Sequence, residues 1–163
     1  MRLPLLALLI ALSLPAVAQA EGPSKIKPNG LGSLRLGMTE EEVEREVGHK
    51  INQDKLGGSC GTARFASSRD YLMFTNDRLR RVTVVSKLYE TKTGIGVGDP
   101  QSDIRKAYGK NVKRSRHAYD PKGYYFSVDF GGRKRIRFET DGSEVTAIHA
   151  GRTPEVDYVE GCA

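Results

Sequence analysis

One segment of the chain occurs twice, and this internal repeat restricts the fold more than any other feature of the sequence. The first copy runs from Gly37 to Gly48, and the second, which starts 61 residues later, runs from Gly98 to Gly109. In each copy a glycine precedes a polar capping region, an acidic and an aliphatic residue follow, and a second glycine closes the segment. We therefore expect two copies of one structural unit that share a core.

Each copy predicts a short helix of about three turns. In the first, Thr39 is a good N-cap, and Glu42 three positions later completes a capping box. In the second, Asp99 is expected to cap the helix, with Pro100 at the first helical position, where a missing N–H is harmless. The closing glycines can adopt the left-handed conformation that ends a helix.

Strand-forming sequence follows each predicted helix, with turn residues between the segments. Asn76-Asp77 and Asp141-Gly142 mark two turns, and Asp-Gly is among the stronger two-residue hairpin signals. The residues at 120–123, Asp-Pro-Lys-Gly, mark a third. The expected hairpins join Tyr71–Thr75 to Leu79–Ser86, Ile136–Thr140 to Val145–Ala150, and Arg116–Tyr119 to Tyr124–Phe130.

The strands alternate between apolar and polar residues, which predicts an antiparallel sheet with one face on a core and the other in water. With the helices on the core face, the predicted class is α+β: two tandem helix-plus-antiparallel-hairpin units that form one layered helix-on-sheet domain. The units are assigned to residues 31–93 and 94–151. A flexible segment at 21–30 is expected before them, and a C-terminal tail at 152–163 after them.

Residues 1–20 have the pattern of a cleaved signal peptide. Met1-Arg2 gives a positive start, Leu3 to Val17 is almost wholly apolar, and Ala18-Gln19-Ala20 is the small-x-small motif of a cleavage site. The apolar run of about 15 residues is shorter than the roughly 20 that a membrane-spanning helix needs, which favours a cleaved signal peptide. A retained membrane anchor is the alternative. We expect a periplasmic or secreted protein without a membrane span.

Cys60 and Cys162 are the two cysteines of the chain. In an oxidising compartment such a pair predicts a disulfide, which would tie the C-terminal tail back to the first unit. Two free thiols, one of them reactive, are the alternative. A two-cysteine metal site would need further ligands, and no residue nearby has a suitable spacing.

The repeat also resembles a known family. A tandem unit of aliphatic-x-x-Gly-Met-Thr-x-x-x-Val-x-x-x-x-Gly, followed by strands that end in a Phe-x-x-Asp hairpin, is similar to the β-lactamase inhibitory protein fold. Outer-membrane assembly lipoproteins of the SmpA/OmlA (BamE) type carry one such unit. The resemblance covers about residues 31–150, although the second copy has Asp99-Pro100 in place of Met-Thr. It implies a protein that binds other proteins and catalyses nothing, but no contact residue of the inhibitor can be matched.

Side chains with catalytic potential do not form a recognisable constellation. His49, His117 and His149 are too far apart along the chain to share a helix turn or a strand. The sequence contains neither a Gly-x-Ser-x-Gly elbow nor a Gly-x-x-x-x-Gly-Lys phosphate loop. We therefore predict a protein that is not an enzyme and has no cofactor and no metal. A pair of catalytic carboxylates among the 20 acidic residues, as in a small hydrolase, stays open as an alternative.

Arginine and tyrosine side chains are expected to share the wet face of the sheet, and these residue types dominate protein-binding hot spots. The formal net charge of +6 also favours anionic partners. The leading hypothesis is an exported protein-binding module, an inhibitor or an envelope-assembly factor. The alternatives are a binder of anionic envelope glycans or lipid headgroups, and a solvated face kept polar against aggregation. Nucleic acid is not an expected partner. The candidate binding face comprises Tyr71, Arg81, Tyr125, Arg135 and Arg137.

Overall fold

The computed structural model describes residues 25–51, 53–54, 59–64 and 69–162, so the predicted signal peptide at 1–20 lies outside the described residues. Eight strands form a large sheet in the order β4-β5-β6-β7-β12-β11-β10-β9, and every neighbouring pair in it is antiparallel. Their bounds are β4 (Gln53–Asp54), β5 (Cys60–Arg64), β6 (Tyr71–Thr75), β7 (Arg78–Val84), β9 (Val112–Arg116), β10 (Tyr124–Asp129), β11 (Lys134–Thr140) and β12 (Val145–Arg152).

A small sheet has the order β3-β2-β1-β8, and its strands are β1 (Lys25–Lys27), β2 (Gly30–Leu31), β3 (Leu34–Arg35) and β8 (Glu90–Thr91). Residues 25–27 and 30, which fall within the segment predicted as flexible, belong to this sheet, and Ile26 is only 1% exposed. The helices are α1 (Glu40–Val47) and α2 (Gln101–Tyr108), with 3-10 turns η1 (Gly109–Asn111) and η2 (Glu155–Asp157).

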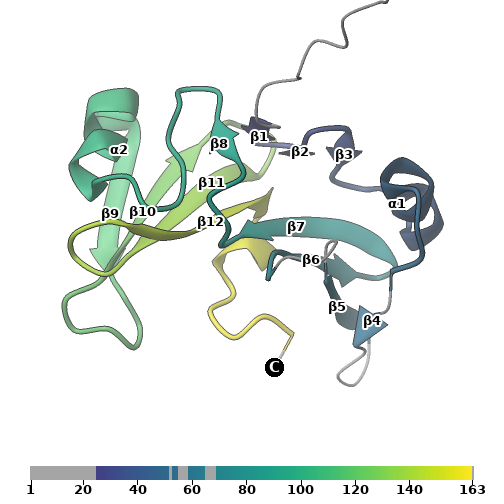
Figure 1. Ribbon diagram of the computed structural model, residues 1–163. Helices are drawn as coiled ribbons and strands as arrows, with labels where there is room; N and C mark the ends of the chain where they lie inside the picture. Colours follow the sequence, from purple (N-terminus) through teal and green to yellow (C-terminus); the bar gives the residue numbers. More distant parts are fainter. Residues whose placement is uncertain (1–24, 52, 55–58, 65–68, 163) are drawn as a thin grey trace, which may run out of the picture.

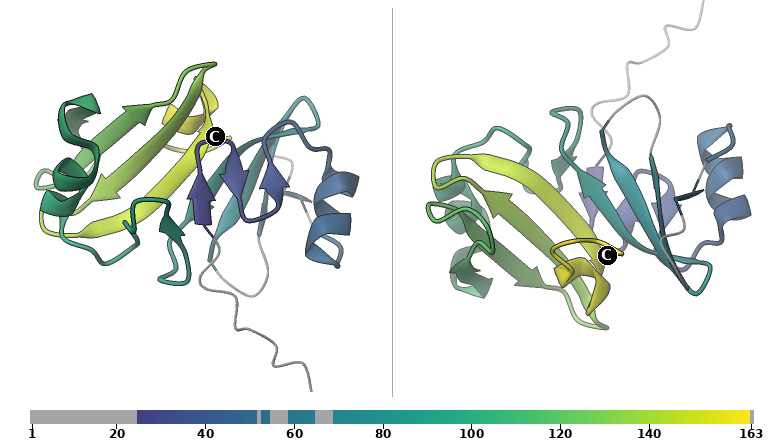
Figure 2. Two further views of the ribbon diagram at one scale, coloured as in Figure 1. Left: turned by 90° about the horizontal axis from the view of Figure 1, so that it is seen from above. Right: turned by 90° about the horizontal axis from the view of Figure 1, so that it is seen from below.

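The predicted fold class, an α+β domain of two helix-plus-hairpin units, is wrong, because the described part of the chain is mostly β. The helices have eight residues each, and each buries one residue fully, Val43 in α1 and Ile104 in α2. Such short helices cannot cover an eight-stranded sheet. The small sheet lies between them and covers the middle of the same face, adding Ile26, Leu31 and Leu34 to the core (Figures 1 and 2).

The internal repeat has a backbone counterpart. The amide of Gly37 donates to the carbonyl of Leu79 at 2.8 Å, and the amide of Leu79 donates to the residue after Gly37. In the second copy, the amide of Gly98 donates to the carbonyl of Val145 at 2.8 Å, and the amide of Val145 donates to the carbonyl of Asp99 at 2.9 Å. Both glycines have positive φ, 96° and 95°, which a residue with a side chain rarely adopts. Each copy is therefore fixed in the same way to the strand that ends its hairpin.

The two helices start differently. Thr39 caps α1 as predicted: its hydroxyl accepts from the amide of Glu42 at 3.2 Å, and the Glu42 carboxylate accepts from the amide of Thr39 at 2.7 Å. The prediction that Asp99 caps α2 is wrong. Pro100 occupies the N-cap, and the Asp99 carboxylate instead accepts from the amide of Gly96 at 2.7 Å.

Two of the predicted hairpins are present, and the third is present with a different first strand, since β9 covers Val112–Arg116 and not the predicted Arg116–Tyr119. Asn76 and Asp77 both have positive φ, as a tight two-residue turn between β6 and β7 requires. The turn at Asp141 joins β11 to β12, and the turn at 120–123 joins β9 to β10. No helix of the described residues has the length and apolarity that a bilayer crossing requires. The core lies between the two sheets, and its largest side chains include Phe74, Phe138, Leu72, Leu79 and Ile148.

Candidate functional site

The face of the large sheet that points away from the core, here called the outer face, is covered at its centre by residues 153–162, here called the C-terminal segment. Figures 1 and 2 show this segment on the side opposite the small sheet, below the strands in Figure 1. Its end is bonded to strand β5 by the disulfide Cys60–Cys162, which confirms the predicted pairing. Within this segment, the side chain of Val156 is fully buried.

Glycine at position 151 on β12 allows this close approach. A Cβ at Gly151 would lie 3.1 Å from the Cβ of Val156 and 2.7 Å from the carbonyl oxygen of Arg80. The 2.7 Å approach to Arg80 is too short for a side chain, and the 3.1 Å approach to Val156 is tight, so a larger residue here would disturb both the neighbouring strand and the C-terminal segment.

Two buried arginines hold the backbone of the C-terminal segment. Arg81, which is 0% exposed, donates from Nη1 to the carbonyl of Tyr158 at 2.7 Å and to that of Glu155 at 3.2 Å. Arg137, which is 7% exposed, donates from Nη1 to the carbonyl of Asp157 at 2.7 Å. Charged donors make stronger hydrogen bonds than neutral ones, so these contacts fix the segment firmly.

The structure does bring the five residues of the predicted binding face to one side of the sheet. That side is not wet, however, and this part of the prediction is wrong. Arg81, Tyr125 and Arg137 are buried, and Tyr71 and Arg135 are partly buried. The C-terminal segment contacts Arg81, Arg135 and Arg137, so these three side chains support the segment, whereas Tyr71 stays partly exposed beside it.

Arg135 anchors the same segment at its edge. Its guanidinium pairs with Asp129 at 2.7 Å and with Asp157 in η2. The hydrogen bonds that Arg135 donates to Asp129 and Asp157 outweigh desolvation and raise the pKa of Arg135. The hydrogen bonds from Arg135 and then Lys113 lower the pKa of Asp129. Arg135 and Asp129 are therefore both charged over the physiological range.

A hydroxyl, an imidazole and a carboxylate lie in series beside these arginines. Thr83 Oγ1 is 2.9 Å from His149 Nδ1, and His149 Nε2 is 3.4 Å from Glu139 Oε1. Burial lowers the pKa of His149, with Arg81 and Arg137 adding to the effect. Burial alone would raise the pKa of Glu139, but the hydrogen bond from His149 and the neighbouring positive charges lower it.

This series has the residue types of a nucleophile, a base and an acid, but its position does not suit catalysis. Thr83 is 1% exposed and His149 is 5% exposed, so a substrate has no access to the hydroxyl. His117 extends the network, because its Nε2 lies 3.9 Å from Glu139 and its ring stacks on Tyr125 at 4.5 Å. These side chains form a polar layer on the outer face of the large sheet. Within the described residues, no group of three or more His, Cys, Asp and Glu is arranged to hold a metal ion.

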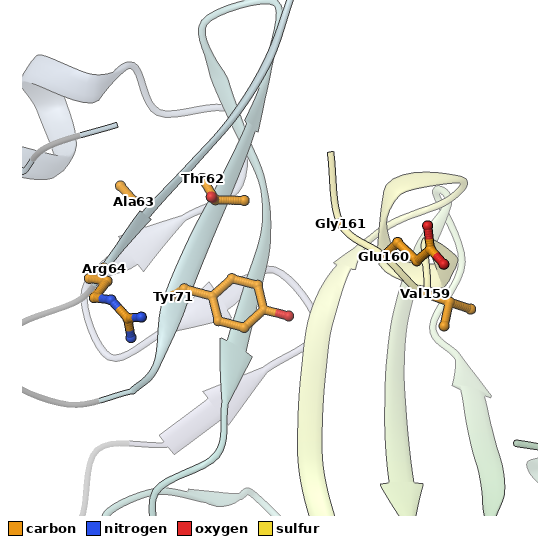
Figure 3. A pocket seen from close by; sticks show the side chains of 7 residues that line it. All are labelled: Thr62, Ala63, Arg64, Tyr71, Val159, Glu160 and Gly161. Atoms are coloured by element: carbon orange, nitrogen blue, oxygen red, sulfur yellow. The ribbon is translucent and has the colours of Figure 1, made fainter. Parts of the chain in front are cut away.

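Two cavities flank the last residues of the C-terminal segment. The first, about 370 Å³, lies between the segment and strands β5 and β6 (Figure 3). The second, about 450 Å³ and here called the C-terminal groove, lies on the other side of the segment, next to the turn after β9. The first is lined by Thr62, Ala63, Arg64, Tyr71, Val159, Glu160 and Gly161. The second is lined by Cys60, Ala118, Tyr119, Tyr158, Val159, Glu160, Gly161 and Cys162.

Comparison with known proteins identifies a similar architecture but no function. No family model and no curated protein matches the chain. A crystal structure of the uncharacterized protein yfeY from Escherichia coli is similar, with a TM-score of 0.53 and 14% sequence identity. The match covers 78% of this chain and 99% of that one. The likeness is one of fold alone.

Exposed large hydrophobic side chains cluster at the C-terminal groove. Of the five large hydrophobic residues that are exposed within the described part of the chain, three line it: Tyr119 at 65%, Tyr158 at 41% and Val159 at 39%. The hydroxyl of Tyr119 also donates to the carboxylate of Glu160, which joins the turn after β9 to the segment. Sequence reasoning missed these residues, because an isolated exposed tyrosine has no periodic signal.

Proposed function

We propose that the chain is an exported, non-enzymatic protein-binding module and that it binds its partner at the C-terminal groove. The observation that carries the proposal is the grouping of Tyr119, Tyr158 and Val159 around one groove of about 450 Å³. Tyrosine offers a large apolar surface, a polar hydroxyl and few rotatable bonds, and it is enriched at binding hot spots. Isolated exposed hydrophobic residues need no explanation, but a cluster does.

The rigid base of the groove supports the same proposal. The disulfide bonds the end of the C-terminal segment to strand β5, and Arg81 and Arg137 donate hydrogen bonds from the sheet to its backbone carbonyls. A surface that is already ordered loses little conformational entropy on binding, which favours affinity. The signal-like residues 1–20, the disulfide and the resemblance to families of protein-binding proteins favour an inhibitor or envelope-assembly factor in the periplasm or outside the cell.

The test is capture from cell-envelope extract with the immobilised mature chain, residues 21–163. We expect one defined protein at constant stoichiometry, with Tyr119→Ser and Tyr158→Ser each lowering its affinity about tenfold or more. Leu88→Ser is the matched control, because Leu88 is 62% exposed and lies outside the groove. If the control weakens capture as much as the tyrosine variants do, the groove is not the binding site.

A second candidate function, binding of an anionic envelope glycan or lipid headgroup, is favoured by the edge strand β9. Lys113, Arg114 and Arg116 are exposed there, and the guanidinium groups of Arg114 and Arg116 lie 4.6 and 5.0 Å from the ring centre of Tyr124. Such binding should weaken steeply with salt and be lost in Arg114→Gln/Arg116→Gln. Binding that is insensitive to salt would contradict this candidate.

A further inference from the structure

The cavity of about 370 Å³ has one wall formed by strands β5 and β6 and another formed by the C-terminal segment (Figure 3). Arg64 and Tyr71 are register partners on these two strands, so both side chains lie on the outer face. Figure 3 shows the Tyr71 hydroxyl pointing from the strands toward Val159 and Glu160. Thr62 adds a second hydroxyl to the same wall.

Arg81 lies directly behind this wall. Its Nη2 is 3.5 Å from the hydroxyl of Tyr71, and it would lie 3.8 Å from a Cβ placed on Gly161. Tyr71 and Gly161 both line the cavity, so the guanidinium of Arg81 lies behind the lining residues and close to the cavity. The Nη1 donors of Arg81 are used by two carbonyls, whereas Nε has no hydrogen-bond partner within the described residues.

The positive charge of this wall is not balanced locally. Within the described residues, neither Arg81 nor Arg64 forms an ion pair with a carboxylate. Burial lowers the pKa of Arg81, which shows that its charge is poorly compensated. A buried cation without an anionic partner is costly, and an anion placed nearby would offset that cost.

Tyr71 connects the buried charge to the open cavity. Its hydroxyl oxygen accepts from Arg81, so its own proton is available to a group inside the cavity. The single acidic side chain among the lining residues, Glu160, already accepts from Tyr119 on the other side of the segment. The strand wall therefore presents hydrogen-bond donors and positive charge and has no carboxylate of its own.

We propose that this cavity binds a carboxylate group, with Arg64 and the Tyr71 hydroxyl contacting the carboxylate and Arg81 supplying charge from behind. The volume fits a small acid or one acidic residue of a polypeptide, either a side chain or a chain terminus. The inference does not rest on the proposed function, because the tyrosines of the C-terminal groove play no part in it. A groove that captures no partner leaves it standing.

The test uses the purified mature chain and three small acids as probes: succinate, N-acetylglutamate α-amide and N-acetyl-alanyl-alanine. Each is paired with its neutral amide: succinamide, N-acetylglutamine α-amide and N-acetyl-alanyl-alanine amide. NMR follows the side-chain Nε–H signal of Arg81 and the ring signals of Tyr71 during titration. We expect at least one acid to shift these signals saturably, and its amide to leave them unchanged. Preference for succinate identifies a free small acid as the ligand, preference for the glutamate probe an acidic side chain, and preference for the dipeptide a chain terminus.

Variants locate the site. Arg64→Gln and Tyr71→Phe should each lower the affinity for the tightest-binding acid about tenfold, because each removes a donor to a charged acceptor. Arg114→Gln is the matched control, since it removes an exposed arginine from the opposite edge of the sheet. The proposal is overturned if no acid shifts the signals at tens of millimolar, if the amides act as the acids do, or if Arg64→Gln binds like the wild type.

Discussion

Residues 31–93 and 94–151, here called the first and second unit after the copy of the sequence repeat that each contains, do not form separate helix-plus-hairpin units. In each, the same backbone hydrogen bonds join the repeat glycine and the residue after it to a strand of the large sheet, yet the outer faces of the two units differ. In the second unit, strands β10 to β12 carry an interlocked polar layer in which the guanidinium of Arg137 lies 3.5 Å from the ring centre of Tyr125 and His149 contacts Glu139. In the first unit, strands β5 and β6 leave a cavity beside Tyr71. The two units therefore share their backbone contacts with the sheet and differ in the side chains of the outer face.

The two units resemble each other on the core side and differ on the outer face. Each has one helix residue buried in the core, Val43 in α1 and Ile104 in α2. The first unit bears the disulfide, the cavity and one wall of the C-terminal groove.

The largest expected effect breaks the link between the two units. Cys60→Ser/Cys162→Ser opens a loop with a sequence separation of 102 residues, and the chain-entropy model gives a loss of about 5 kcal/mol in the free energy of unfolding. Urea denaturation of the variant and of the reduced wild type should give the same lowered midpoint. An oxidised wild type that unfolds at the midpoint of the variant would show that the bond adds no stability.

Much of this architecture follows from local signals in the sequence. The capping box at Thr39, the turn at Asn76-Asp77 and the Cys60–Cys162 pairing were predictable, because short-range chemistry or residue counting determines each of them. The small sheet was not predictable in this way. Its strands have two or three residues each, too few to show a period of two.

The wet outer face was a wrong prediction for a different reason. Strand alternation places Arg81 and Arg137 on the polar side of the sheet, which is correct, but it does not show what lies above them. Burial of both depends on contacts with Glu155, Asp157 and Tyr158. A buried arginine that binds backbone carbonyls has the same sequence pattern as an exposed one.

A second, smaller effect is a pH dependence of the free energy of unfolding that arises from His149 in the second unit. The pKa of His149 in the folded protein lies below the ordinary value of 6.5, so the unfolded chain binds a proton first as the pH falls. The free energy of unfolding should therefore decrease below about pH 6.5, by at most about 1.4 kcal/mol per pH unit. His149→Gln should flatten this slope between about pH 5 and 7.

Urea denaturation across this pH range measures the slope. His49→Gln is the control, because His49 is exposed at the end of α1 in the first unit and should leave the slope unchanged. Parallel curves for wild type and His149→Gln would show that the buried network does not couple stability to pH. The range stops near pH 5 because Glu139, whose pKa is lowered, loses its own stabilising charge at still lower pH.

The smallest effect concerns the two helix starts. Thr39→Ala removes the acceptor for the amide of Glu42 and should lower the free energy of unfolding by about 1 kcal/mol. Asp99→Ala removes the acceptor for the amide of Gly96 instead. Amide hydrogen exchange should accordingly quicken at Glu42 in the first variant and at Gly96 in the second. The amide of Asp103, which donates to the carbonyl of Pro100 at 2.9 Å, should keep its protection in the second variant. Faster exchange at Asp103 in Asp99→Ala would mean that both helices are capped by side chains in solution, and the two copies would then share one helix start.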